Sequence, residues 1–190
     1  MKLLLYCTKA KPYLRDYRGK AIYNRFVISP TDRPFTSDDT QPILNGKIVA
    51  ECDFEVEKLQ IVYGKGWETK NIKGTENIEK LTCLSRDKLY QYCKGNGYAI
   101  HIKNLHIFDK PKELSEYMNG KFEEWEYRDL YKLKKAPQNM QYVSTWYCDE
   151  IARSGTTYIL ISIRPEWLCK ILNGEKTIEV RKKVLKEMIK

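Results

Sequence analysis

Three charged residues near the end of the chain have types and a spacing that suit chemistry on a phosphate or a nucleobase. Lys176, Glu179 and Arg181 stand in the stretch EKTIEVRK, where polar and apolar residues alternate. This period of two predicts a strand that presents Thr177, Glu179 and Arg181 on one face, with Lys176 at the turn before it. Such a group of charges could hold a phosphate, a nucleobase edge or a reacting amide.

The same residues have two other interpretations. The simplest is an ion pair on the surface of a sheet, which would contribute under about 1 kcal/mol. In an enzyme, Glu179 would be a general base, while Lys176 or Arg181 would stabilise the charge of a transition state. A binding site, a catalytic site and a surface ion pair are all compatible with the spacing.

The segment before these residues predicts the elements that position them. Residues 158–163, YILISI, form an apolar run typical of a strand. Pro165 suits the first position of a helix, and Gly174 suits the left-handed position just after a helix end. The spacing between them predicts one apolar helix face, formed by Trp167, Leu168, Ile171 and Leu172.

The remainder of the chain has the pattern of several short strands and few helices. Strand patterns occur at residues 2–7, 47–61, 98–108 and 136–148. Thr75 and Ser85 are each suited to N-cap a short helix, and the stretch KGNG at 94–97 would end the second helix. Many short strands with short helices predict an α+β fold, in the form of a small β-barrel decorated with helices.

The net charge of +9 is concentrated at the two ends of the chain. Residues 1–25 carry a balance of +6, and residues 164–190 carry a balance of +4. Both ends also contain strand patterns, so we expect them to meet and form one basic surface that includes Lys9, Lys11 and Arg15. The alternative is that they are two solvated tails.

The six cysteines are scattered and contain no Cys-x-x-Cys pair, a usage typical of reduced thiols in the cytoplasm. A zinc site that combines a cysteine with His101 or His106 would lack the usual ligand spacing, so we expect no metal and no other cofactor. The sequence has no signal-peptide pattern and no apolar run of about 18 residues. We therefore expect a cytoplasmic protein without a membrane partner.

The C-terminal stretch ISIRPEWLCKILNGEKTIEVRK resembles the signature of the ASCH family, whose members share a PUA-like β-barrel. The family pattern is a strand, a proline-started helix and then G-x-K-x-x-E-x-R, matched here by Gly174, Lys176, Glu179 and Arg181. Other segments are similar to the same family, and together these stretches cover about two thirds of the chain: LLLYCTK, NGKIVAECDFEV, GYAIHIKNLHIFDKPKEL and KAPQNMQYV.

The order of the segments differs from the family pattern, in which the G-x-K-x-x-E-x-R segment comes first. The resemblance therefore implies a circularly permuted single domain over residues 1–190, in which 158–190 pack back beside 1–8. Two alternatives are a truncated fragment of a longer protein and a barrel completed by a neighbouring chain through strand exchange.

The family resemblance implies a module that binds RNA or a free, modified nucleotide, as a monomer or a homodimer. The lysines and arginines would contact phosphate, Tyr6 would stack on a base, and Glu179 would accept hydrogen bonds from an exocyclic amine. The full set of expected ligand-binding residues is Lys176, Glu179, Arg181, Thr177, Lys9, Lys11, Arg15 and Tyr6.

Two alternative functions follow from the same resemblance. Some relatives are ribonucleases and others are amidohydrolases of a modified cytidine, which would make Lys176 and Glu179 the catalytic residues. The amidohydrolases have a threonine where Glu179 stands, so their hydroxyl nucleophile is missing at the matching position. The chain also looks similar to phage-encoded accessory proteins, which implies a host protein or a host nucleotide signal as the target.

Overall fold

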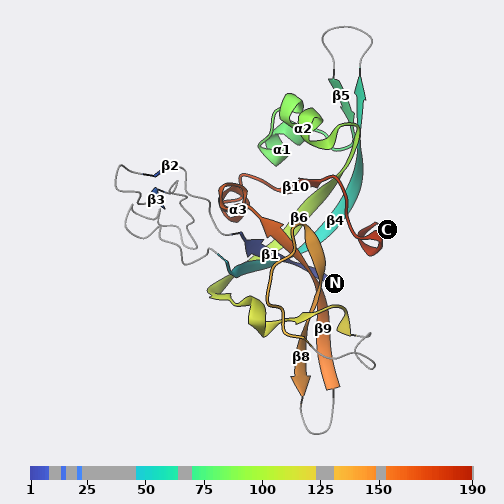
Figure 1. Ribbon diagram of the computed structural model, residues 1–190. Helices are drawn as coiled ribbons and strands as arrows, with labels where there is room; N and C mark the ends of the chain where they lie inside the picture. The colour runs from blue at the N-terminus through green and yellow to red at the C-terminus, as the bar shows by residue number, and fades with distance from the viewer. Residues whose placement is uncertain are drawn as a thin grey trace. The chain divides into compact units, whose positions relative to one another are not determined.

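The structure is a computed structural model that describes residues 1–8, 14–15, 21–22, 46–63, 70–122, 131–148 and 153–189 (Figure 1). The chain divides into two compact units. Unit 1 comprises Met1–Cys52 and Leu105–Asn173, and unit 2 comprises Asp53–Asn104 and Gly174–Lys190. The expectation of a single domain over residues 1–190 stays a prediction.

Eight strands form one mixed sheet in the order β10-β6-β4-β1-β9-β8-β7, with β5 paired to β4. In the part of the chain that the structure describes, this order has two ends and does not close on itself. The fold is therefore a mixture of strands and short helices, and the small β-barrel stays a prediction. The strands are β1 (Lys2–Cys7), β4 (Ile48–Tyr63), β5 (Lys70–Lys73), β6 (Asn96–Lys112), β7 (Met118–Asn119), β8 (Met140–Cys148), β9 (Arg153–Ile163) and β10 (Ile178–Arg181).

The other described elements are short. A separate two-stranded sheet pairs β2 with β3. Its strands and the helical turns are β2 (Leu14–Arg15), β3 (Ala21–Ile22), α1 (Ile78–Thr82), α2 (Arg86–Cys93), η1 (Leu114–Glu116), α3 (Pro165–Leu172) and η3 (Lys186–Met188).

The centre of unit 1 is the parallel pair β1 and β9, in which Lys2 lies opposite Tyr158 and Cys7 opposite Ile163. Strands buried on both faces have continuous apolar runs rather than alternation. This explains the continuous apolar run of β1, in which Leu3, Leu4 and Leu5 are all fully buried. A core of Leu4, Tyr6, Ile48, Tyr117, Leu133, Val143 and Leu160 packs around this pair.

Helix α3 confirms the start and the end that the sequence predicted. Pro165 occupies its first turn, and Gly174 follows its end with φ +75°. Leu168, Ile171 and Leu172 are buried as expected from the spacing. Trp167 is only partly buried, with the ammonium of Lys170 5.8 Å from its ring centroid.

Unit 2 is built on the neighbouring strands β10, β6, β4 and β5, and the helices α1 and α2 pack on one face of this sheet (Figure 1). Its core contains Leu59, Ile61, Ile78, Leu89, Cys93, Ala99, Ile178 and Val180. The predicted helix end at 94–97 is confirmed, because α2 ends at Cys93 and β6 begins at Asn96.

The two predicted helix caps of unit 2 have different outcomes. The Ser85 side chain accepts a hydrogen bond from the Lys88 N–H, so Ser85 does cap α2. The prediction for Thr75 is wrong, because α1 begins at Ile78 with Asn77 before it at φ +55°. The Thr75 hydroxyl instead donates a hydrogen bond to the Glu57 carboxylate on β4.

Candidate functional site

The structure brings Lys176, Glu179 and Arg181 together in unit 2, and we call them the charged cluster. Lys176 Nζ lies 3.3 Å from Glu179 Oε2, and Arg181 Nε lies 3.1 Å from Glu179 Oε1. Lys176 Nζ also donates a hydrogen bond of 3.0 Å to the carbonyl oxygen of Thr82, the last residue of α1. One carboxylate therefore stands between two cations.

Pairing of β10 with β6 sets this geometry. The register places Glu179 opposite Ile100 and Arg181 opposite Tyr98. Ile178 and Val180 are buried in the core of unit 2, as the alternation predicted. Thr177 is exposed, and its backbone N–H donates to the Leu81 carbonyl oxygen at 3.0 Å.

Burial distinguishes the charged cluster from an ion pair on a surface. The side chains of Lys176, Glu179 and Arg181 are 2, 11 and 12% exposed. Burial lowers the pKa of Lys176, and the nearby Glu179 carboxylate opposes that shift. The cluster consequently ties β10 to the end of α1, and its part in ligand binding or catalysis stays a prediction.

The other expected ligand residues are distributed differently. Tyr6 belongs to unit 1, where it is 7% exposed and lines a cleft. Arg15 lies in β2, of which the structure describes only the backbone. Lys9 and Lys11 lie outside the described residues. The joint basic surface of the two chain ends stays a prediction.

The cleft beside Tyr6 has a volume of about 770 Å³, and we call it the unit 1 cleft. Its rim carries the exposed lysines Lys132, Lys134 and Lys135, while Tyr6 and Ser162 are buried at its base. The described residues that line it are Tyr6, Thr8, Gly46, Glu113, Leu114, Ser115, Lys132, Leu133, Lys134, Lys135, Ala136, Pro137 and Ser162.

The unit 1 cleft forms where the parallel strands β1 and β9 end. Thr8 N–H donates to the Ile163 carbonyl oxygen at 2.9 Å, which holds the two ends together. Ser162 Oγ donates to the Pro137 carbonyl oxygen at 2.6 Å and thereby fixes the segment that carries the lysines. The carboxyl ends of parallel strands are a common place for ligands in open sheets.

The electrostatics of the unit 1 cleft favour an anion. Among the described residues that line it, the one carboxylate, Glu113, forms an ion pair with Lys47. Within the described residues, no ion pair or hydrogen bond engages the ammonium groups of Lys132, Lys134 and Lys135. Their charge is therefore available to a ligand.

The hydroxyl of Tyr6 adds a polar group to the base of the cleft. Burial raises the pKa of Tyr6, and the neighbouring Cys7 raises it further. The phenol is therefore protonated at neutral pH and can donate a hydrogen bond.

Sequence reasoning missed the three lysines of this cleft. They belong to the stretch KLKKAP, which follows a segment whose pattern does not distinguish a helix from a strand. The signal that could have found them is the local charge, because three of the four residues 132–135 are lysines next to a proline-containing loop.

The described residues contain no group of three or more His, Cys, Asp or Glu side chains that could hold a metal ion. The cysteines that the structure describes in full are free thiols, and burial with nearby Cys169 and Glu166 raises the pKa of Cys7 to about 12. None of the described helices is long and apolar enough to cross a membrane.

Comparison with known proteins identified no relative of the chain. No family model, curated protein sequence or solved structure matches the chain.

Proposed function

We propose that this protein binds RNA or a free nucleotide, and that the unit 1 cleft receives one nucleotide of the ligand. The observation that carries the proposal is the lining of this cleft, in which Lys132, Lys134 and Lys135 stand above the buried Tyr6. A rim of cations over an aromatic and apolar base matches the two ends of a nucleotide, its phosphate and its base.

The rim supports phosphate binding by charge. Three ammonium groups face one carboxylate that is already paired with Lys47. Lysine binds phosphate as a flexible point charge rather than through a fixed fork, so the rim would accept phosphates in several positions. Each contact releases a counterion, so the affinity should fall with added salt.

The base of the cleft supports the other half of the ligand. Leu114, Leu133 and Pro137 line it together with Tyr6. The volume of about 770 Å³ lies within the range of about 300–1,000 Å³ that is typical of small-molecule sites. Ser115, Thr8 and the Tyr6 hydroxyl provide donors and acceptors for the base edge or the ribose.

The resemblance to the ASCH family supports the same class of ligand. It also leads us to propose a PUA-like barrel as the finer description of the sheet. The scattered reduced cysteines lead us to propose a cytoplasmic location.

The first experiment is mass spectrometry of ligand released from denatured protein that was purified without nuclease treatment. Calorimetric titration with the four ribonucleoside monophosphates then measures affinity directly. Wild-type protein should bind at least one of them, and Lys134→Ala/Lys135→Ala should weaken binding by about tenfold or more.

The matched control is Lys110→Ala/Lys170→Ala, which removes the same charge from unit 1 but not from the lining of the cleft. Equal losses in the two double variants would mean that only the overall charge matters. Absence of nucleotide binding by wild type at low salt would reject the proposal.

A further inference from the structure

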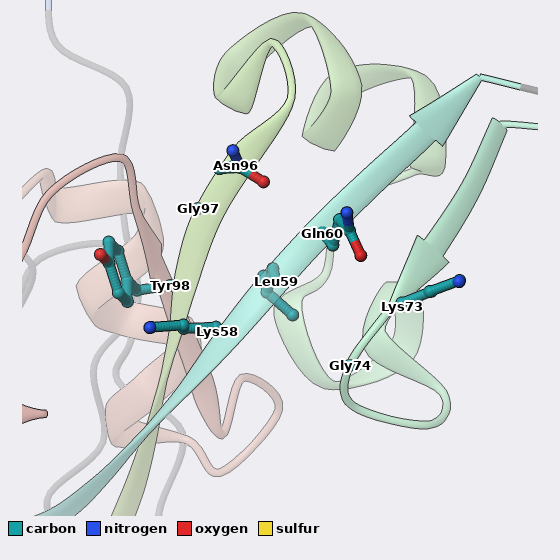
Figure 2. Close-up of a pocket in the computed structure, with 8 residues that line it drawn as sticks. All are labelled: Lys58, Leu59, Gln60, Lys73, Gly74, Asn96, Gly97 and Tyr98. Atoms are coloured by element: carbon teal, nitrogen blue, oxygen red, sulfur yellow. The ribbon is translucent and has the colours of Figure 1, made fainter. Parts of the chain in front are cut away.

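A second pocket lies in unit 2, on the face of its sheet opposite the helices. It has a volume of about 480 Å³. Figure 2 shows Lys58 and Gln60 on β4, Asn96 and Tyr98 on β6, and Lys73 at the end of β5. We call these five residues the unit 2 face.

Alternation along β4 separates two chemically different faces. Leu59 and Ile61 belong to the core with α1 and α2, whereas Lys58 and Gln60 are exposed. On the core side the charges are paired, since Glu55 lies 2.7 Å from Lys103 and Glu57 lies 3.2 Å from His101. On the unit 2 face, the described residues that line the pocket include no carboxylate.

Pairing across the sheet aligns the polar residues. Gln60 on β4 lies opposite Lys73 on β5, and Tyr98 on β6 lies opposite Arg181 on β10. Directly opposite residues of an antiparallel pair project from the same face. The carboxylate of Glu179, two residues before Arg181 on β10, is held between Lys176 and Arg181, so the charged cluster keeps a net charge of +1.

The side chains of the unit 2 face have no partners among the described residues. No hydrogen bond or ion pair there engages Lys58, Lys73, Gln60, Asn96 or Tyr98. Tyr98 is partly exposed, and the other four are exposed. Two cations, two amides and one aromatic ring are therefore available to a ligand from the same pocket.

We infer that the unit 2 face binds single-stranded nucleic acid. The lysines supply contacts to phosphate, Tyr98 supplies a surface for stacking of an unpaired base, and the amides of Gln60 and Asn96 can bond base edges. A sheet that is covered by helices on one face and bears a partly exposed aromatic ring on the other suits splayed-out bases. A duplex hides its base faces and would use only the lysines.

This inference does not rest on the unit 1 cleft, because every residue that carries it belongs to unit 2. The two sites are tested by different variants and different ligands. If mononucleotides failed to bind the unit 1 cleft, the inference about the unit 2 face would still stand. If oligonucleotides failed to bind the unit 2 face, the proposal for the unit 1 cleft would still stand.

The test uses the full chain and fluorescence anisotropy with a labelled oligouridylate of about ten nucleotides, a length within the site sizes of single-strand binders. Wild type should bind it more tightly than it binds an RNA duplex of the same length. Lys58→Ala/Lys73→Ala should weaken binding by about tenfold or more and lower the salt slope by about 1.4, since each phosphate contact to a single strand contributes about 0.7.

Tyr98 has a different expected effect, because stacking does not release counterions. Tyr98→Ala should weaken binding by roughly fivefold to a hundredfold and leave the salt slope unchanged, while Tyr98→Phe keeps the ring and should bind as wild type does. The same series with oligothymidylate separates RNA from DNA, because only RNA offers 2′-hydroxyl groups.

The control is Lys80→Ala/Lys88→Ala, which removes two exposed lysines from the helices α1 and α2 on the opposite side of the sheet. This variant should bind nearly as wild type does. Equal losses in the two lysine pairs, an unchanged affinity of Tyr98→Ala, tighter binding of the duplex, or no binding by wild type at low salt would each overturn the inference. A circular dichroism spectrum of each variant equal to that of wild type excludes misfolding as the cause of weaker binding.

Discussion

At the scale of single residues, the charged cluster shows how one carboxylate can make two buried cations tolerable. Glu179 neutralises part of the charge of Lys176 and Arg181, which lie 3.3 and 3.1 Å from its two oxygens. The buried ammonium of Lys176 has one further acceptor, the Thr82 carbonyl oxygen. Removing a buried counter-charge is usually more damaging than removing the whole group of charges.

The first prediction follows for Glu179→Gln, which keeps the shape of the side chain and removes its charge. Lys176 and Arg181 would then lose the carboxylate that they share, so we expect a loss of about 3–5 kcal/mol of unfolding free energy. Urea unfolding followed by circular dichroism measures this. Glu175→Gln is the control, since Glu175 is exposed, and equal stability of the two variants would contradict the prediction.

Nucleotide affinity and turnover of the same variant separate the remaining roles of Glu179. As a hydrogen-bonding residue of a ligand site, its replacement would shift ligand preference, whereas a general base would lose turnover and keep affinity. If Glu179 only holds β10 and α1 together, the variant protein that stays folded should keep both the affinity and the turnover of wild type.

The second prediction concerns pH and Lys176. Burial lowers the pKa of Lys176 in the folded state below its unfolded value, so the unfolded chain retains the proton to higher pH. Stability rises with pH wherever the unfolded state binds more protons. Wild type should therefore gain stability relative to Lys176→Met as pH rises from neutral toward about 10.5. Urea midpoints of both proteins between these limits test this, and a constant difference would contradict it.

At the scale of elements, local patterns predicted what depends on local geometry. The start of α3 at Pro165, the cap of α2 by Ser85 and the alternation of Ile178 with Val180 are all readable from a few neighbouring residues. The wrong cap at Thr75 shows the limit, because its hydroxyl is bound by Glu57, a residue 18 positions earlier in the chain.

Strand β4 shows a second limit of local patterns. Ile48, Ala50 and Cys52 are buried in unit 1, whereas Leu59 and Ile61 are buried in unit 2. Val49 is buried as well, so both faces are covered at the start of β4, whereas only the face of Leu59 and Ile61 is covered near its end. Which faces of β4 are buried depends on the elements that pack on each half of the strand, and the local sequence pattern does not contain that information.

The same limit of local sequence patterns applies to the candidate site. The charged cluster could be predicted as a group of neighbours on one strand, but its burial depends on α1, whose Thr82 is distant in the chain. The unit 1 cleft and the unit 2 face could not be predicted, since each combines residues from several strands.

The third prediction tests the packing of α2 against β6. A Cβ atom at Gly97 would lie 2.7 Å from Cys93 Sγ and 3.4 Å from the Arg181 carbonyl oxygen. Gly97→Ala should therefore cost about 1–3 kcal/mol, the usual range for overpacking. Cys93→Ala removes the sulfur and leaves its Cβ at 3.5 Å, so the double variant should be more stable than the sum of the two single changes implies. Strict additivity in urea unfolding would contradict this contact.

At the scale of the whole molecule, each unit has its own core and its own basic surface. The core of unit 1 is formed by residues of β1, β4, β8 and β9 with Tyr117 and Leu133, and that of unit 2 by residues of β4, β6, β10, α1 and α2. The unit 1 cleft and the unit 2 face each carry lysines without partners among the described residues. These lysines lie in the middle of the chain, so they are distinct from the charge excess of its two ends.

The last prediction tests this division by deleting residues 174–190, which removes β10 and with it Ile178 and Val180 from the core of unit 2. The core of unit 2 would lose two of its buried residues and β6 would lose its partner β10, so the amides of α2 and of β6 at 96–104 should exchange with solvent much faster. The amides of β1, β8 and β9 should stay protected, because their core residues are all retained. Hydrogen exchange with mass spectrometry measures both sets in one experiment.

A longer deletion of 158–190 also removes most of β9, the parallel partner of β1, and should leave an insoluble or molten protein. If the shorter deletion abolished protection in both units alike, the two cores would be one cooperative structure, and if the longer deletion stayed cooperatively folded, β9 would not be the centre of unit 1.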